Sequence, residues 1–246
     1  MDIPLIEIRN LTARYGDETI LDNISVDIMP NRITVILGAS GCGKTTLIKN
    51  IFRLYQPSSG SVKIFGREVT DMDELEYEEI LKRIGMLFQN GALINSLNIF
   101  DNIAIPLEQH TRLPLEIRDR IIRVKLKQVN LAHTELLTPA ELSGGMKKRA
   151  ALARALVLDP EILVCDEPSA GLDPLTSASL DNLILNLKEL LNMTIIIVTH
   201  ELASIHRIAD HLIFLDQGRV IFTGTLAEAK KSTLPAVESF FQVGTF

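Results

Sequence analysis

The chain has 246 residues, of which 46% are apolar and 23% charged, a composition that is typical of a globular protein and excludes intrinsic disorder. Its 31 acidic residues outnumber its 25 lysines and arginines, and the formal net charge of −6 argues against broad attraction to nucleic-acid backbones. The only two cysteines, Cys42 and Cys165, argue against a disulfide framework or a cysteine metal site and favour a reducing compartment.

The sequence carries no signal for a membrane span. No apolar run approaches the roughly 18 residues that cross a bilayer, and the first residues lack the apolar core of a signal peptide. We therefore expect a soluble protein in which any membrane role comes through partners.

Taken in chain order, short apolar runs alternate with helical patterns, which predicts βαβ units and a mainly parallel sheet. Continuous apolar character predicts four strands that are buried on both faces: Ile33–Leu37, Ile84–Phe88, Ile162–Cys165 and Ile195–Val198. Other runs mix polar and apolar positions and predict a second, antiparallel sheet: Leu5–Arg9, Ile24–Ile28, Ser61–Phe65, His211–Leu215 and Arg219–Phe222.

The middle of the chain, about residues 90–158, has mostly helical spacing and predicts an inserted α-helical subdomain. One helix face is expected from Ile117, Ile121, Val124 and Val129. A second helix is expected after the Ile162–Cys165 strand, with its buried face at Leu180, Leu183, Ile184, Leu187, Leu190 and Leu191. We predict one compact α/β domain over residues 1–225 and a C-terminal tail over 226–246.

A complete phosphate-loop motif follows the first of the buried strands. The residues from Gly38 to Thr45 read GASGCGKT and match G-x-x-x-x-G-K-[ST]. Backbone N–H groups of such a loop, with the N-terminus of the next helix, bind phosphate oxygens. Lys44 would reach the β- and γ-phosphates, and the Thr45 hydroxyl would bind Mg²⁺. A glycine-rich turn that binds nothing is the alternative. The predicted nucleotide-binding residues here are Gly38, Ser40, Gly41, Cys42, Gly43, Lys44, Thr45 and Thr46.

Two adjacent acids end the Ile162–Cys165 strand. Charged groups at the end of a buried strand are costly unless they have partners or a function, and ligands of open α/β sheets bind at this edge. We predict that Asp166 binds Mg²⁺ and that Glu167 activates a water molecule for attack on the γ-phosphate. Taken alone, such a pair is more often a solvated turn.

The stretch Leu142-Ser143-Gly144-Gly145-Met146 resembles the LSGGQ signature of the ATP-binding-cassette (ABC) family. A serine hydroxyl, glycine N–H groups and a helix N-terminus together make an anion site. The basic run that follows, Lys147 to Arg149, is predicted to be a solvated helix face.

This resemblance implies several further roles. The signature residues Ser143, Gly144 and Gly145 would close over the nucleotide of a second copy in a head-to-tail dimer. Tyr15 resembles the aromatic residue that stacks on adenine, Gln89 the glutamine that contacts Mg²⁺ and water, Asp173 the D-loop aspartate and His200 the switch histidine. Taken singly, Tyr15 is more often a half-buried strand residue and His200 a satisfied histidine at a strand end. The resemblance covers roughly residues 5–225.

Met146 stands where the family usually has glutamine. The signature with Met146 and the stretches Gln89–Leu93 and Asn98–Leu107 resemble those of the ATPase subunit of Mla-type (maintenance of lipid asymmetry) phospholipid transporters. That branch implies a membrane permease, an Mce-type substrate-binding protein, a small STAS-domain subunit, and a place at the cytoplasmic face of the bacterial inner membrane.

Two other functions remain open at this point. The chain could power an importer of another solute, such as an amino acid. It could also be a soluble ABC ATPase acting on DNA or ribosomes, although such proteins usually carry two cassettes, coiled coils or zinc modules. This chain has one cassette and no basic excess, so no nucleic-acid partner is predicted.

Overall fold

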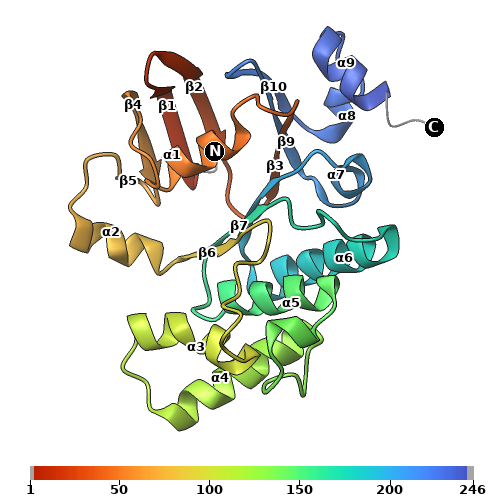
Figure 1. The fold of residues 1–246 in the computed structure, drawn as a ribbon. Coiled ribbons are helices and arrows are strands. Elements are labelled where there is room, and N and C mark those ends of the chain that lie inside the picture. The colour runs from red at the N-terminus through yellow and green to blue at the C-terminus, as the bar shows by residue number, and fades with distance from the viewer. Residues whose placement is uncertain (1–2, 243–246) are drawn as a thin grey trace. The chain divides into compact units, whose positions relative to one another are not determined.

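The structure, a computed structural model, describes residues 3–242. The chain forms two compact units, one from Met1–Ile80 with Ile196–Phe246 and the other from Leu81–Ile195. Residues 243–246 of the predicted tail lie outside the described residues. The fold is α/β, with parallel and antiparallel strands and helices packed on them (Figure 1).

The first unit contains a four-stranded antiparallel sheet with the strand order β2-β1-β4-β5. It is formed by β1 (Ile6–Tyr15), β2 (Glu18–Ile28), β4 (Ser59–Ile64) and β5 (Arg67–Glu68). The hairpin between β1 and β2 turns over Gly16 and Asp17, and Gly16 takes a φ of 58° that a tight turn requires. The predicted strands of this sheet are confirmed, although β1 and β2 are longer than expected.

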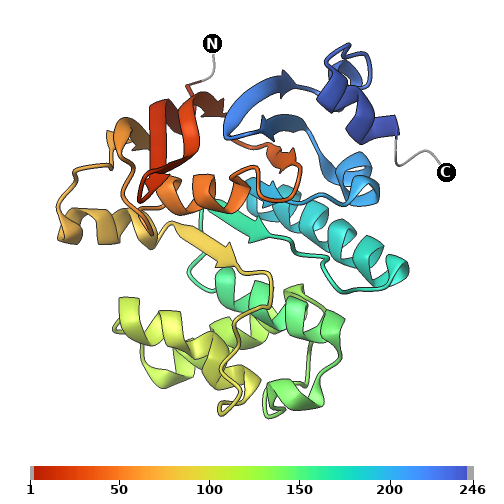
Figure 2. The same cartoon turned by 45° about the horizontal axis from the view of Figure 1, so that its top comes forward.

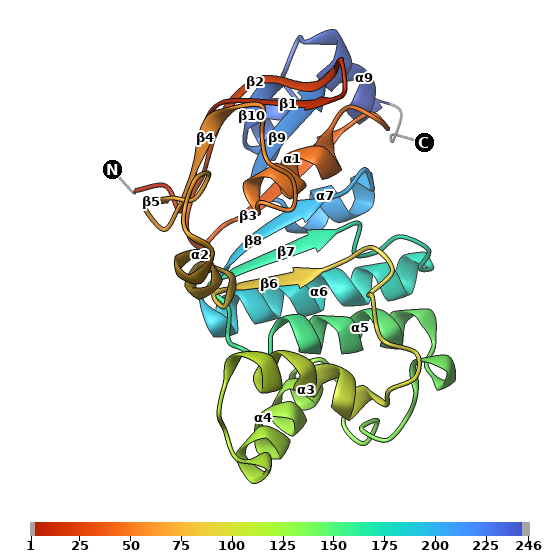
Figure 3. The ribbon, with the colours of Figure 1, turned by 60° about the vertical axis from the view of Figure 1, so that its left-hand side comes forward.

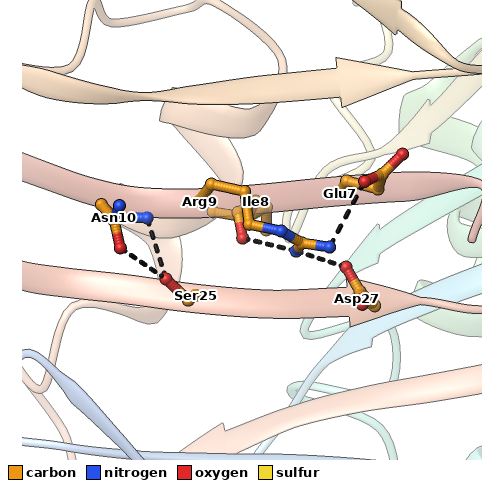
Figure 4. A network of polar contacts seen from close by, with 6 residues as sticks. All are labelled: Glu7, Ile8, Arg9, Asn10, Ser25 and Asp27. Carbon is orange, nitrogen blue, oxygen red and sulfur yellow. Dashed lines mark hydrogen bonds and ion pairs between the residues drawn. The ribbon is translucent and has the colours of Figure 1, made fainter.

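An irregularity in β1 is held by side chains of the neighbouring strand (Figure 4). Asn10 has a φ of 50°, its backbone N–H donates to Ser25 Oγ at 2.9 Å, and Ser25 Oγ lies 3.2 Å from Asn10 Oδ1. The register shifts between Ile8 and Leu11, both of which are fully buried. Without the bulge, the alternation of side chains along β1 would not place both Ile8 and Leu11 on the core face; the extra residue restores it.

The same unit carries β3 (Ile33–Gly38), which is buried throughout, and α1 (Lys44–Ile51), the two elements that flank the phosphate loop. β9 (His211–Asp216) pairs parallel with β3, and β10 (Arg219–Gly224) pairs antiparallel with β9. The prediction that these last two strands belong to the second, antiparallel sheet was wrong. Only the ends of β9 are polar, and its residues 212–215 are buried as in a central parallel strand.

The remaining helices of this unit follow its strands. α7 (Leu202–Ile208) precedes β9, while α8 (Leu226–Ala229) and α9 (Pro235–Gln242) follow β10, beside which they lie in Figure 2. Phe240 of α9 packs edge-to-face on Phe214 of β9 with ring centroids 5.3 Å apart, and Val237 is fully buried. The described part of the tail therefore packs on its own unit. α2 (Glu74–Leu81) and β8 (Thr194–Val198) contain the points where the chain passes between units.

In the second unit, a strand and several helices pack around helix α5 (Gly144–Ala155). β6 (Ile84–Leu87) pairs parallel with β7 (Ile162–Asp166), and α5 contacts β6 and the helices around it (Figure 3). Those helices are α3 (Ile99–His110), α4 (Leu115–Gln128) and α6 (Pro174–Leu191), with a short 3-10 turn at Pro139–Glu141. The helical region expected over about 90–158 is present.

The inner face predicted for this helix was right at Val129, the C-cap residue of α4, and wrong at Ile117 and Val124. Ile117 and Val124 are 38% and 54% exposed, whereas Ile122 and Leu126 are fully buried together with Val129. Lys125 lies within this buried stripe and forms an ion pair with Asp159, so a charged residue occupies a place where the pattern calls for an apolar one. In α6 the expected core residues are buried except toward the C-terminus, where Leu190 is 68% exposed.

Candidate nucleotide site and catalytic loops

The phosphate loop joins the buried strand β3 to helix α1, as the motif predicts. Gly43 has a φ of 104° and closes the loop directly before α1. A Cβ at this position would lie 2.7 Å from Leu21 Cδ2 and 3.2 Å from the carbonyl oxygen of Ile20. The turn therefore needs glycine for both its backbone conformation and its close packing on β2.

Lys44 and the start of α1 form the basic part of this loop. Lys44 Nζ donates to the carbonyl oxygens of Gly38 and Ala39, both at 2.9 Å, so the ammonium group lies over the loop. No side chain caps the N-terminus of α1, since its N-cap residue is Gly43. Helix N–H groups, the positive end of the helix dipole and a lysine thus converge on one loop, which is the arrangement that binds phosphates.

The other residues of the phosphate loop differ in solvent exposure. Thr45 and Ser40 are exposed, and Thr46 is partly exposed. Cys42 is only 6% exposed, and burial raises the pKa of its thiol above the usual value, which disfavours the reactive thiolate. Cys42 is therefore a packing residue of the loop rather than a nucleophile.

Two tyrosines form an exposed aromatic pair in the first unit. Tyr15 ends β1 and is 44% exposed, and its ring packs edge-to-face on that of Tyr55 with centroids 5.4 Å apart. Lys49 Nζ lies 5.3 Å from the Tyr55 ring centroid. Tyr15 is thus a strand residue with about half of its surface exposed, as the alternative interpretation expects, and its adenine-stacking role stays a prediction. Tyr55 carries no motif by which the sequence could have revealed it. His200 follows β8 in the same unit and is exposed.

In the second unit, the register of two strands brings the predicted catalytic residues to one edge. Leu87 of β6 pairs with Cys165 of β7, so Gln89 and Glu167 each follow two residues after this pair. Glu167 has a φ of 46°, a left-handed conformation that is uncommon outside glycine and concentrates at functional sites. The chain therefore turns out of the strand at Glu167, as a functional role for both Asp166 and Glu167 requires.

A lysine of α5 connects these two loops. Lys148 Nζ donates to the carbonyl oxygen of Gln89 and lies 3.3 Å from that of Glu167. Its side chain is 7% exposed, so the prediction of a solvated face for the run from Lys147 to Arg149 was wrong at this position. The reason is that carbonyl oxygens from two distant loops replace water around the ammonium group.

The signature residues open α5. Ser143 is the N-cap of the helix and accepts a hydrogen bond from the N–H of Met146 at 3.3 Å. Gly144 and Gly145 form its first turn, and a Cβ on Gly145 would lie 2.6 Å from Thr176 Cγ2 of α6. The segment therefore presents a serine and a helix N-terminus with little side-chain bulk, which suits close approach by a phosphate.

Asp173 is the N-cap of α6. Its Oδ1 accepts hydrogen bonds from the N–H groups of Leu175 and Thr176 at 3.1 and 3.0 Å. Hydrogen bonding to Thr176 lowers the pKa of the Asp173 carboxyl below its usual value. The structure thus gives this residue a capping role, whatever it contributes across a dimer.

The fold and the phosphate loop together define a P-loop ATPase of the α/β class. The family model for ABC transporters matches residues 21–170. The phospholipid transport ATP-binding protein MlaF of Haemophilus influenzae is 41% identical, with 94% of this chain and 88% of that protein covered. The probable ribonucleotide transport ATP-binding protein mkl of Mycobacterium leprae is 40% identical, with 96% and 68% covered.

A solved structure of an ATP-binding cassette has the same fold. The dimeric ATP-binding cassette MJ0796, in a post-hydrolysis state with ADP and Pi, has a TM-score of 0.81 at 30% identity, covering 90% of this chain and 98% of that one. The chain belongs to the ABC transporter family, as an ATP-binding subunit with ATPase activity. Within residues 3–242, no helix is long and apolar enough to cross a membrane.

Proposed function

We propose that this chain is the ATP-hydrolysing subunit of an ABC transporter that powers phospholipid transport at the bacterial inner membrane. The observation that carries the choice of cargo is the 41% identity, over 94% of the chain, to a protein named for intermembrane phospholipid transport. Met146 in the signature supports the same branch. The mkl relative, named for ribonucleotide transport, keeps another solute as the second candidate.

In the proposed reaction, Lys44 and the N–H groups of the phosphate loop bind the phosphates of ATP, and Tyr15 stacks on its base. Glu167 takes the proton from the attacking water, and His200 contacts the γ-phosphate. The phosphate loop neutralises charge that develops on the transferred group, because its donors and ammonium group are fixed before the reaction begins.

The oxygen donors present suit Mg²⁺. A threonine hydroxyl (Thr45), a carboxylate (Asp166) and an amide oxygen (Gln89) are hard ligands, and Mg²⁺ in phosphoryl-transfer enzymes is usually bound by one or two such groups together with phosphates and waters. We propose that Thr45, Asp166 and Gln89 hold the ion when the nucleotide is bound. The ion would polarise the phosphate oxygens and offset their charge.

We further propose that two copies of the chain form a head-to-tail dimer. Ser143, Gly144 and Gly145 lie at the start of α5, where a phosphate would meet a helix N-terminus, whereas the chain's own nucleotide is proposed to bind at the phosphate loop before α1. In a two-fold dimer, the signature of each copy would contact the nucleotide bound to the phosphate loop of the other copy. The dimer would then contain two equivalent ATP sites. The D-loop residue Asp173 would lie at the same interface.

A groove in the second unit, lined by apolar side chains together with polar ones such as Gln109 and Arg154, supports a membrane permease as a partner. It has a volume of 340 Å³ and is lined by side chains that include Phe88, Ile94, Ile105 and Pro106. Phe88 and Ile94 are each 43% exposed, and Phe88 directly precedes Gln89. A permease helix bound in this groove would contact Phe88, the residue before Gln89. A change in the position of Gln89 would then reach the permease through the main chain. The chain would then lie at the cytoplasmic face, with an Mce-type binding protein and a STAS-domain subunit completing the transporter.

The hydrolysis step is tested with two variants. Glu167→Gln should retain ATP binding and lose turnover by about 10²- to 10⁴-fold, because the general base is removed. Lys44→Ala should raise the Kd for ATP by about ten-fold or more, since charged hydrogen bonds to phosphate are lost. Normal turnover by Glu167→Gln, or unchanged ATP binding by Lys44→Ala, would contradict the assigned roles.

The cargo is tested on the same proteins. The tagged chain is purified from native membranes, its partner proteins are identified by mass spectrometry, and bound lipids are extracted and compared with those from the Lys44→Ala variant. Phospholipid with an Mce-type protein and a permease is the expected result. A permease that co-purifies with a soluble-solute binding protein and no lipid would establish the second candidate instead.

A further inference from the structure

Lys148 is a buried cation that joins the main chains of two predicted catalytic residues. It lies on α5, little more than one turn after Ser143. Its Nζ donates to the carbonyl oxygen of Gln89 and, at 3.3 Å, to that of Glu167. These residues belong to different loops, which follow the paired strands β6 and β7, and one side chain bridges their main chains.

The surroundings of Lys148 make this contact costly to lose. Burial lowers the pKa of the Lys148 ammonium group, while the negative charges of Glu167 and Asp166 oppose that effect. The carbonyl oxygens provide the hydrogen bonds that water would otherwise supply. If either loop moved away, a buried charge would lose a partner, and such a loss is strongly unfavourable.

The rest of α5 holds the same loop from a second point. Arg154 donates to the carbonyl oxygens of Gly91 and Ala92 at 2.7 and 2.8 Å. A Cβ placed on Gly91 would lie 3.2 Å from Ala151 Cβ, so the loop packs closely on the helix. The loop after β6 is therefore held on α5 at two points, and Lys148 is the contact of this set that also reaches Glu167.

We propose that Lys148 is a positioning residue that couples the signature helix to the Gln89 and Glu167 loops, and thereby links the two ATP sites of the dimer. This rests on the proposed function, in which Ser143 serves the nucleotide of the partner while Gln89 and Glu167 serve the chain's own. Closure of a signature on one nucleotide would shift α5, and Lys148 transmits that shift to the catalytic loops of the other site.

The test replaces the ammonium group while keeping the length of the side chain. Lys148→Met removes the donor, Lys148→Arg keeps a cation that can reach carbonyl oxygens, and Lys147→Met is a matched control on the same helix. Lys148→Met should bind ATP within about two-fold of wild type, lose about ten-fold or more in kcat, and lower the Hill coefficient for ATP toward 1. Lys148→Arg should recover most of kcat and of the cooperativity.

Hydrogen exchange provides a readout that does not depend on activity. In Lys148→Met, exchange should rise in the segments 89–92 and 167–170 and stay at the wild-type level in the phosphate loop and in β3. A variant that fails to fold would show raised exchange in β3 as well, in which case the Lys148→Arg data decide. Wild-type kcat, cooperativity and exchange in Lys148→Met would overturn the proposal, as would a loss that Lys148→Arg does not recover.

The failure of this proposal is distinguishable from failure of the proposed function. If Glu167→Gln abolishes turnover but Lys148→Met behaves as wild type, only the role of Lys148 is wrong. If Glu167→Gln turns over normally, the catalytic assignment on which the coupling rests is wrong.

Discussion

Single residues carry backbone strain at the loops where chemistry is expected. Glu167 takes a φ of 46° and Gly43 a φ of 104°. For a residue with a Cβ, such a conformation costs about 1–2 kcal/mol, so it persists only where surrounding contacts hold it. The carbonyl oxygen of Glu167 accepts from the backbone N–H of Ala170 at 3.2 Å and from Lys148 Nζ at 3.3 Å. Lys148 is therefore one of the contacts that hold this strained turn.

Two glycines of the phosphate loop form a matched pair for testing this local strain. Both Gly41 and Gly43 have positive φ, but a Cβ on Gly41 meets nothing within 4 Å, whereas one on Gly43 would contact Leu21 and Ile20. Gly41→Ala should lower the free energy of unfolding by about 1–2 kcal/mol from backbone strain alone. Gly43→Ala should lower it by about 1–3 kcal/mol more, because overpacking is added. Urea denaturation of both variants measures the difference, and a larger loss in Gly41→Ala would contradict it.

The sequence predicts site residues well where the chemistry depends on local spacing, and poorly where it depends on distant contacts. The phosphate loop between Gly38 and Thr45 was recognisable because its glycines, lysine and threonine are neighbours. Lys148 was not, because a lysine in a basic run is ordinarily solvated and its acceptors belong to loops far away in sequence. Tyr55 was missed for the same reason, since only the fold brings it to Tyr15.

At the scale of elements, helix and strand positions followed from the pattern, but their inner faces did not always. In α4 the apolar residues Ile117, Ile121 and Val124 have helical spacing, yet the buried stripe runs through Ile122 and Leu126. Periodicity alone does not show which of two apolar stripes, one residue apart, is the buried one. The stripe that is buried also contains Lys125, so its sequence is more polar than that of the exposed stripe. The burial of Ile122 and Leu126 sets the orientation of the helix, and the ion pair with Asp159 allows Lys125 to lie in the same stripe.

Two neighbouring positions of α4 test this orientation. Ile122→Ala should lower the free energy of unfolding by about 2–5 kcal/mol, because Ile122 is fully buried and its loss leaves a cavity. Val124→Ala, at a position 54% exposed, should change it by no more than about 0.5 kcal/mol. Denaturant unfolding measured under the same conditions compares the two, and a larger effect at Val124 would restore the face that the sequence pattern favoured.

At the scale of the whole molecule, the phosphate-loop motif precedes α1, and the signature residues Ser143, Gly144 and Gly145 open α5, where we propose a second phosphate contact. One nucleotide needs both in the proposed mechanism, so the proposed working unit is two copies. Neither the composition nor the strand pattern predicts this dimer. It is what the resemblance of Leu142–Met146 to the ABC signature implies, and the place of Ser143 at the start of α5 is compatible with it.

Complementation between inactive variants tests whether each ATP site draws residues from two copies. Glu167→Gln and Ser143→Ala should each have strongly reduced turnover as homodimers. In a mixed dimer, one site combines Glu167 of the Ser143→Ala copy with Ser143 of the Glu167→Gln copy and is intact, while the other site holds both changes. Random mixing should therefore restore at most about one quarter of wild-type turnover, since half of the dimers are mixed and each has one intact site. Two different tags and tandem purification isolate the mixed dimer, in which turnover above that of either parent, up to about half of wild type, is expected, the value falling as the two sites are more strongly coupled. Sites made entirely within one copy would leave the mixed dimer as inactive as its parents and with no site that has both Glu167 and Ser143. A mixed dimer that neither turns over nor hydrolyses ATP in a single round would therefore contradict the shared site and with it the coupling through Lys148.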